Sequence, residues 1–146
     1  MAAQIDERVR RLLDGPNMAH VASVDRTGRP RVQPVWIGTD GDRLLINTQE
    51  GRTWPKRVRR DPRISLSIVN AEMPAEYVEI VGSVVAETTD GAKDHLDELS
   101  RVYTGGDYPN HFEGEIRVIF QIEPERINYV NLLEHVPGMP ASESEQ

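Results

Sequence analysis

The feature that most limits the possible folds is a series of six short apolar segments that follow one another through short turns. Segments of this length with alternating apolar and polar residues are typical of β-strands, and short connections make neighbouring strands antiparallel. The first three strands are expected in meander order. The series predicts a closed barrel, because closure removes exposed sheet edges. The six segments are 17–25, 31–38, 43–49, 63–69, 76–87 and 116–122.

Two residues predict local irregularities in the strands of this barrel. Pro34 lies inside the second strand and cannot donate a ladder hydrogen bond, so that strand is expected to be an edge or to be bulged. Gly82 lies in the middle of the long fifth strand, where a bulge or bend is expected. A further strand at 127–130 follows Pro124 as a continuation of the last segment.

Three helices are predicted around the strands. The first spans 4–14, with Ile5, Val9, Leu12 and Leu13 on one face. The second is short, begins with Thr53 as its cap and stops at Asp61-Pro62. The third follows the fifth strand with Thr88 or Thr89 as its cap, and its apolar face consists of Ala92, Leu96, Leu99 and Tyr103.

Length and composition fit one domain. The chain has 146 residues, of which 38% are apolar, enough for one core. Residues 1–136 are expected to form the domain and the polar residues 137–146 a flexible tail. The chain has no cysteine and no apolar run of the roughly 20 residues that a membrane helix needs. We therefore expect a cytoplasmic protein without a membrane partner.

Charge is concentrated in one segment. Residues 52–63 hold six basic residues and one acidic residue, a net charge of +5, although the whole chain carries −7. A globally acidic chain is a poor candidate for binding nucleic acid. The island indicates either a bound small anion or a solvated helix face, and the count alone does not separate the two.

The start of the second helix is the candidate anion site. Its first amides and its dipole favour negative charge, and arginine can grip a phosphate with two bonds. Trp54 is expected to pack on the barrel, or alternatively to narrow or build the pocket. The candidate ligands are Arg52, Thr53, Lys56 and Arg57, with the strand-end residues Asn47, Thr48 and Gln49 within reach.

Conventional catalytic motifs are absent from the sequence. No two of the histidines stand four residues apart, and no HExxH, GxGxxG or GxxxxGK[ST] motif occurs. The sequence therefore names no catalytic side chain and no metal site. Tyr103, Tyr108 and His111, near the loop after the third helix, are possible substrate-facing groups, and Glu113 and Glu115 are interpreted as solvated loop acids.

The order of several short motifs resembles the pyridoxamine 5′-phosphate oxidase-like split barrels. More narrowly, the chain resembles the branch that uses the deazaflavin coenzyme F420 in place of FMN. The resemblance covers about residues 4–131. Its motifs are GRP at 28–30, PVW at 34–36, RRDPR at 59–63 and VGSV at 81–84. Many relatives place a lysine where this chain has Trp54, which leaves the cofactor open between F420 and FMN.

The resemblance implies a mainly β, six-stranded antiparallel split barrel with flanking helices. It also implies a homodimer with cofactor grooves at the interface, the ring lying along Pro34, Val35 and Trp36. The implied activity is hydride transfer from reduced F420 to a small organic acceptor, with the chemistry supplied by the cofactor. The alternatives are an FMN-binding oxidase or reductase, a non-catalytic F420 storage protein, and a regulatory or nucleic-acid-associated protein that uses the basic helix.

Overall fold

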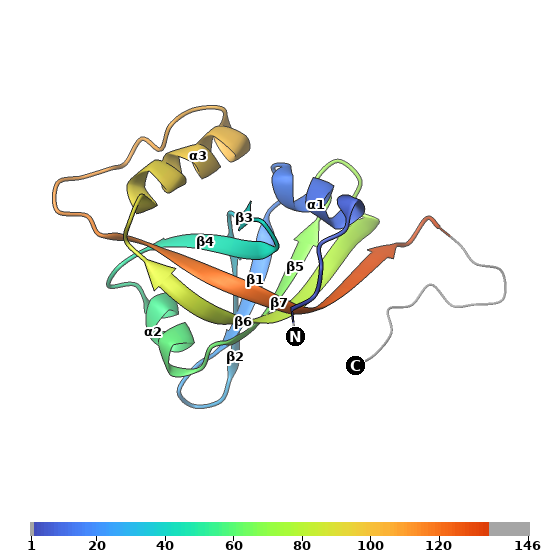
Figure 1. The fold of residues 1–146 in the computed structure, drawn as a ribbon, viewed down its shortest axis with the longest axis horizontal. Helices are drawn as coiled ribbons and strands as arrows, with labels where there is room; N and C mark the ends of the chain where they lie inside the picture. The colour runs from blue at the N-terminus through green and yellow to red at the C-terminus, as the bar shows by residue number, and fades with distance from the viewer. Residues whose placement is uncertain (1, 135–146) are drawn as a thin grey trace.

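Seven strands form one antiparallel sheet in the order β2-β1-β5-β6-β7-β4-β3. The computed structural model describes residues 2–134, so the tail expected at 137–146 lies outside it. Three helices lie around the curved sheet (Figure 1). The elements are α1 (Glu7–Asp14), β1 (Ala19–Val24), β2 (Pro30–Val35), β3 (Gly38–Asp40), β4 (Arg43–Gln49), α2 (Thr53–Arg60), β5 (Arg63–Val69), β6 (Glu76–Thr88), α3 (Ala92–Thr104) and β7 (Arg117–Asn131).

The barrel is split rather than closed. β2 and β3 are the outer strands of the sheet and do not pair with each other. Only Trp36 and Ile37 separate them along the chain, so Val35 and Gly38 lie at most about 11 Å apart. The sheet therefore curls so that its two outer strands come close together. They are joined by the two-residue connection and not by ladder hydrogen bonds. This arrangement confirms the predicted mainly β, antiparallel split barrel. The prediction of a closed barrel is wrong.

The expected meander of the first three strands is wrong. β2 pairs with β1, but the third expected strand, β4, pairs with β7, and a short additional strand, β3, precedes it. The total is therefore seven strands and not six. β7 also runs through Pro124 without interruption, because Pro124 lies opposite the irregularity at Gly82 of β6.

Pro34 and Gly82 lie where the sequence predicts an edge strand and an irregular strand. Pro34 lies on the edge strand β2, opposite His20. The register between β6 and β7 shifts at Val81/Gly82. A Cβ on Gly82 would lie 2.4 Å from the carbonyl oxygen of Glu123, so only glycine allows the strands to approach here.

The helices differ from prediction mainly at their first residues. α1 begins at Glu7, because the side chain of Asp6 accepts a hydrogen bond from the Val9 amide and caps it. Arg52, not Thr53, is the cap residue of α2, and it makes no side-chain capping bond. Gly91 is the cap residue of α3 in a left-handed conformation, in place of Thr88 or Thr89.

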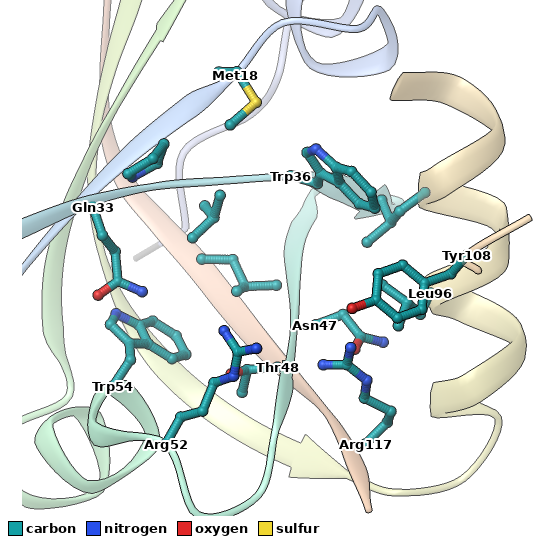
Figure 2. A pocket seen from close by; sticks show the side chains of 14 residues that line it. Met18, Gln33, Trp36, Asn47, Thr48, Arg52, Trp54, Leu96, Tyr108 and Arg117 are labelled. Atoms are coloured by element: carbon teal, nitrogen blue, oxygen red, sulfur yellow. The ribbon is translucent and has the colours of Figure 1, made fainter. Parts of the chain in front are cut away.

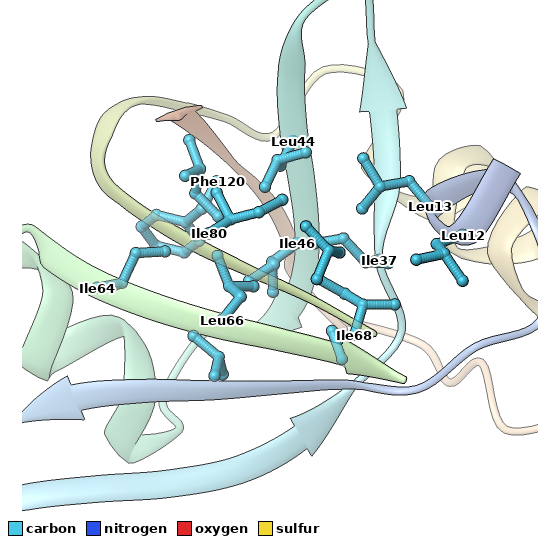
Figure 3. Close-up of a cluster of buried hydrophobic side chains, with 14 of the residues drawn as sticks. Leu12, Leu13, Ile37, Leu44, Ile46, Ile64, Leu66, Ile68, Ile80 and Phe120 are labelled. Carbon is cyan, nitrogen blue, oxygen red and sulfur yellow. The ribbon is translucent and has the colours of Figure 1, made fainter. Parts of the chain in front are cut away.

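The barrel interior is filled by one apolar cluster (Figure 3). α1 contributes Leu12 and Leu13 near the Ala19 end of β1, and α2 contributes Trp54 and Val58 near its other end. Phe120 of β7 is fully buried in the cluster and meets the Trp54 ring edge to face. This packing fixes the first turn of α2 against the barrel, next to the cavity described below.

Candidate functional site

One cavity of about 220 Å³ lies between the edge of the barrel and α3. Figure 2 shows it bordered by β2 and β4 on one side, by the start of α2 below, and by α3 and its following loop opposite. Its wall contains both aromatic and polar side chains. It is lined by Met18, Gln33, Pro34, Val35, Trp36, Ile46, Asn47, Thr48, Arg52, Trp54, Leu96, Leu99, Tyr108 and Arg117.

Two arginines supply positive charge to this cavity from different elements (Figure 2). Arg52 caps α2, and among residues 2–134 its side chain has no hydrogen-bond or ion-pair partner. Arg117 begins β7, is buried, and has Glu115 as its ion-pair partner, with 3.5 Å between Arg117 Nε and Glu115 Oε2. The terminal nitrogens of both guanidinium groups are therefore available to an anion that enters the cavity.

Three buried polar atoms of the wall residues have no hydrogen-bond partner, namely Asn47 Oδ1, Trp54 Nε1 and Arg117 Nε, the last of which faces Glu115. The orientation of the Asn47 amide is fixed, because its Nδ2 donates to the carbonyl oxygen of Ala92 at 2.7 Å. Its oxygen is thereby left as a free acceptor, while Trp54 offers a free donor. Leaving such groups unpaired costs about 1–3 kcal/mol each, so pairing them with a donor and an acceptor of a ligand, after small shifts of the side chains that cover them, would be favourable.

Aromatic rings form the wall near α3. Trp36 stacks on Tyr103, with ring centroids 5.4 Å apart and planes within 12° of parallel. The Tyr103 hydroxyl accepts from the Ile37 amide and donates to the carbonyl oxygen of Asn17, so both partners of the stack are held. Tyr108 meets Trp36 edge to face at 6.5 Å. A planar ligand could pack against aromatic rings at this side of the cavity.

Three other arginines of the basic segment 52–63 have partners away from the cavity lining. Arg59 forms bidentate bonds to Glu50 at 2.6 and 2.9 Å and a second pair to Glu87, and these contacts raise its pKa. Arg63 is paired with Asp61 at 2.7 Å. Arg57 is buried against Ser23 of β1 at 3.3 Å, and burial lowers its pKa. The interpretation as a solvated helix face therefore holds for Arg59, Arg63 belongs to β5, and the anion-site interpretation fits Arg52.

The structure brings together seven of the eleven residues that the sequence proposed. Pro34, Val35, Trp36, Asn47, Thr48, Arg52 and Trp54 line the cavity. The other four lie outside its lining. Gln49 ends β4, Thr53 and Lys56 are exposed on α2, and Arg57 faces β1. Trp54 packs on the barrel and is at the same time part of the wall.

Sequence reasoning missed Arg117 and misread Glu115. Arg117 stands alone at the start of a strand, far along the chain from the basic segment, and no local pattern marks it. The sequence predicts Glu115 to be a solvated loop acid, yet its side chain is 1% exposed and lies between His111 and Arg117. Only the pairing of β7 with β4, which places Arg117 opposite Gln49, brings these residues to the site.

Two further findings concern other kinds of site. Within residues 2–134, no group of three metal-ligating side chains could hold a metal ion. No helix in the same range is long and apolar enough to span a bilayer.

A curled antiparallel sheet whose two outer strands do not pair with each other, together with three helices, has the architecture of a split barrel. The profile of the pyridoxamine 5′-phosphate oxidase family matches residues 5–131, and the chain belongs to this family of flavin-binding oxidoreductases. No curated protein matches the chain in sequence.

Several solved structures share the fold. An F420 reductase is 24% identical, with a TM-score of 0.73 over 81% of this chain and 94% of that one. A conserved hypothetical protein from Mycobacterium tuberculosis is 15% identical, with a TM-score of 0.68 over 97% and 95%. General Stress Protein 26 from Bacillus anthracis is 18% identical, with a TM-score of 0.63 over 84% and 91%. At these identities the likeness concerns the fold alone.

Proposed function

We propose that this protein binds coenzyme F420 in the cavity and transfers a hydride from the reduced coenzyme to a small organic acceptor. The observation that carries the proposal is the combination of an unpaired arginine, Arg52, with an unpaired acceptor and an unpaired donor on one aromatic wall. A deazaflavin ring is planar, carries both N–H donors and carbonyl acceptors, and is linked to an anionic side chain. The likeness to an F420 reductase points in the same direction.

The residues of the cavity fit this group. Asn47 Oδ1 would accept from a ring N–H, and Trp54 Nε1 would donate to an oxygen of the ligand. Arg52 and Arg117 would hold the anionic part, while Trp36 and Tyr108 would border the ring. When bound, the coenzyme supplies the hydride, and the chain contributes binding, orientation and exclusion of water. This division of labour agrees with a sequence that lacks a catalytic constellation.

The size of the cavity supports a homodimer. A volume of about 220 Å³ is below the roughly 300–1,000 Å³ typical of pockets that enclose a small ligand. A coenzyme of this size would extend beyond the cavity, and a second copy of the chain could cover the exposed part. Val32 on the outer strand β2 is 70% exposed, which provides an apolar contact beside the cavity. Light scattering of the purified protein would test the dimer.

An FMN-binding oxidoreductase is the second candidate, because the family match by itself favours a flavin. FMN has the same kind of ring and one phosphate, so it fits the same wall. Parallel fluorescence titrations of the purified apo-protein with F420 and with FMN decide between the two. We expect F420 to bind more tightly. Tighter binding of FMN would indicate an FMN-binding oxidoreductase. Binding of neither cofactor would refute both proposed functions.

A further inference from the structure

A chain of four alternating charges connects the surface to the cavity through His111. We propose that His111 is a positioning residue that fixes two cavity residues, Tyr108 and Arg117, and tunes the strength with which the cavity binds an anion. The effect on the coenzyme rests on the proposed function, whereas the charge chain itself does not.

His111 lies between carboxylates from two different elements. Its Nε2 is 2.9 Å from Oδ1 of Asp97 on α3, and its Nδ1 bonds to Oε1 of Glu115 in the loop before β7. A neutral imidazole has only one N–H and could satisfy only one of these oxygens. The arrangement therefore favours the doubly protonated, charged ring. Accordingly, Glu115 first and Asp97 second raise the pKa of His111.

Each of the two carboxylates also holds one cavity residue. The Oδ1 atom of Asp97 accepts from the backbone amide of Tyr108 at 3.0 Å, which anchors the loop that carries this ring. The second oxygen of Glu115 faces Nε of Arg117 at 3.5 Å. The Arg117 guanidinium in turn lies 5.3 Å from the centre of the Tyr108 ring. His111 thus ties together both groups that close the α3 side of the cavity.

The charge state of His111 changes the field in the cavity. With the ring protonated, Asp97, His111, Glu115 and Arg117 sum to zero, and Glu115 is shared between two cations. With the ring neutral, the group carries one negative charge, and Glu115 offsets Arg117 alone. An anion in the cavity therefore binds better while His111 is charged.

The other charged groups nearby leave this balance intact. Arg101 of α3 faces Asp97 but is itself bonded to Asp107 at 2.6 Å. Tyr108 contacts the His111 ring edge to face, with ring centroids 5.3 Å apart. Glu115 and Asp97 are thus the charged groups that contact His111 directly within the described residues.

The first test needs no ligand. In the apo-protein, the His111 imidazole should titrate in NMR spectra above the ordinary histidine value of about 6.5. Asp97→Asn keeps an acceptor for the Tyr108 amide but removes a charge, and should lower the His111 midpoint. His20→Gln, at an exposed histidine of β1 whose side chain makes no hydrogen bond or ion pair among residues 2–134, is the matched control and should leave the His111 midpoint unchanged. A wild-type midpoint at or below the ordinary value overturns the proposal.

The second test measures F420 affinity of the wild type and of His111→Gln between pH 6 and 9. Ligand ionisation is common to both proteins, so the ratio of their Kd values isolates His111. Wild-type affinity should exceed that of the variant at pH 6 by about three- to tenfold, and the ratio should approach one above the His111 midpoint. A constant ratio overturns the tuning. If the wild type binds neither F420 nor FMN, the proposed function fails and the NMR titration still decides the charge chain.

Discussion

Arg52 and Arg59 lie seven residues apart on the same short helix, yet they are in opposite electrostatic situations. Arg59 donates four hydrogen bonds to Glu50 and Glu87, whereas Arg52 lines the cavity without an acidic partner among residues 2–134. Glu87 lies on β6, far from the helix in sequence. A count of charges along the chain therefore detects a basic segment. Only the fold shows that Arg59 is paired with acidic residues, whereas Arg52 remains available to a ligand.

The largest expected effect contrasts these two arginines directly. Arg52→Gln should weaken F420 binding by about 10- to 150-fold, since a charge-assisted hydrogen bond contributes about 1.5–3 kcal/mol. Arg59→Gln is the matched control and should leave the Kd unchanged. Fluorescence titration of both variants measures the contrast. Equal losses in the two variants would mean that the whole basic face of α2 attracts the ligand and that the distinction is incorrect.

The next effect concerns the unpaired indole of Trp54. Trp54→Phe should weaken F420 binding about fivefold, which corresponds to about 1 kcal/mol for a lost hydrogen bond. The free energy of unfolding should fall only modestly, because the smaller ring leaves a void beside Phe120 but the variant no longer buries an unpaired donor. Affinity and urea unfolding together check this prediction. A variant with unchanged affinity would place the ligand away from Trp54.

Arg59→Gln provides the third prediction, on stability. The side chain is 36% exposed, so its network with Glu50 and Glu87 contributes only about 0.5–1 kcal/mol to the free energy of unfolding. The loss should shrink in 1 M salt because exposed ion pairs are screened. Urea unfolding at low and high salt measures it. A loss that does not depend on salt would indicate packing on Phe120 as its cause, since the guanidinium also lies 5.4 Å from that ring.

Lys56→Gln should have the smallest effect. Lys56 is exposed on α2 and does not line the cavity, so affinity and stability should both stay within about 0.5 kcal/mol of the wild type. The same titration and unfolding measurements apply. A tenfold weaker Kd would instead return Lys56 to the anion site that the sequence proposed.

Local signals predicted most of the strands and seven residues that line the cavity. Pro34 on the edge strand, Gly82 at the irregularity and Asp61-Pro62 after α2 each act within a few residues, so the sequence alone reveals them. The pairing of β4 with β7 joins segments about 70 residues apart, and no local pattern encodes it. Arg117 and Glu115 reach the site through that pairing, which explains why the sequence did not reveal them.

The central claim is that the cavity beside Arg52 holds the coenzyme, and its tryptophans can report this directly. The chain has only two tryptophans, Trp36 and Trp54, and both line the cavity. An NMR spectrum of the indole N–H groups, assigned with Trp54→Phe, should show both signals shift as F420 is added, with Trp54 moving to lower field as its N–H gains an acceptor. If fluorescence reports saturation with F420 while both indole signals stay in place, the coenzyme binds elsewhere and the account is contradicted.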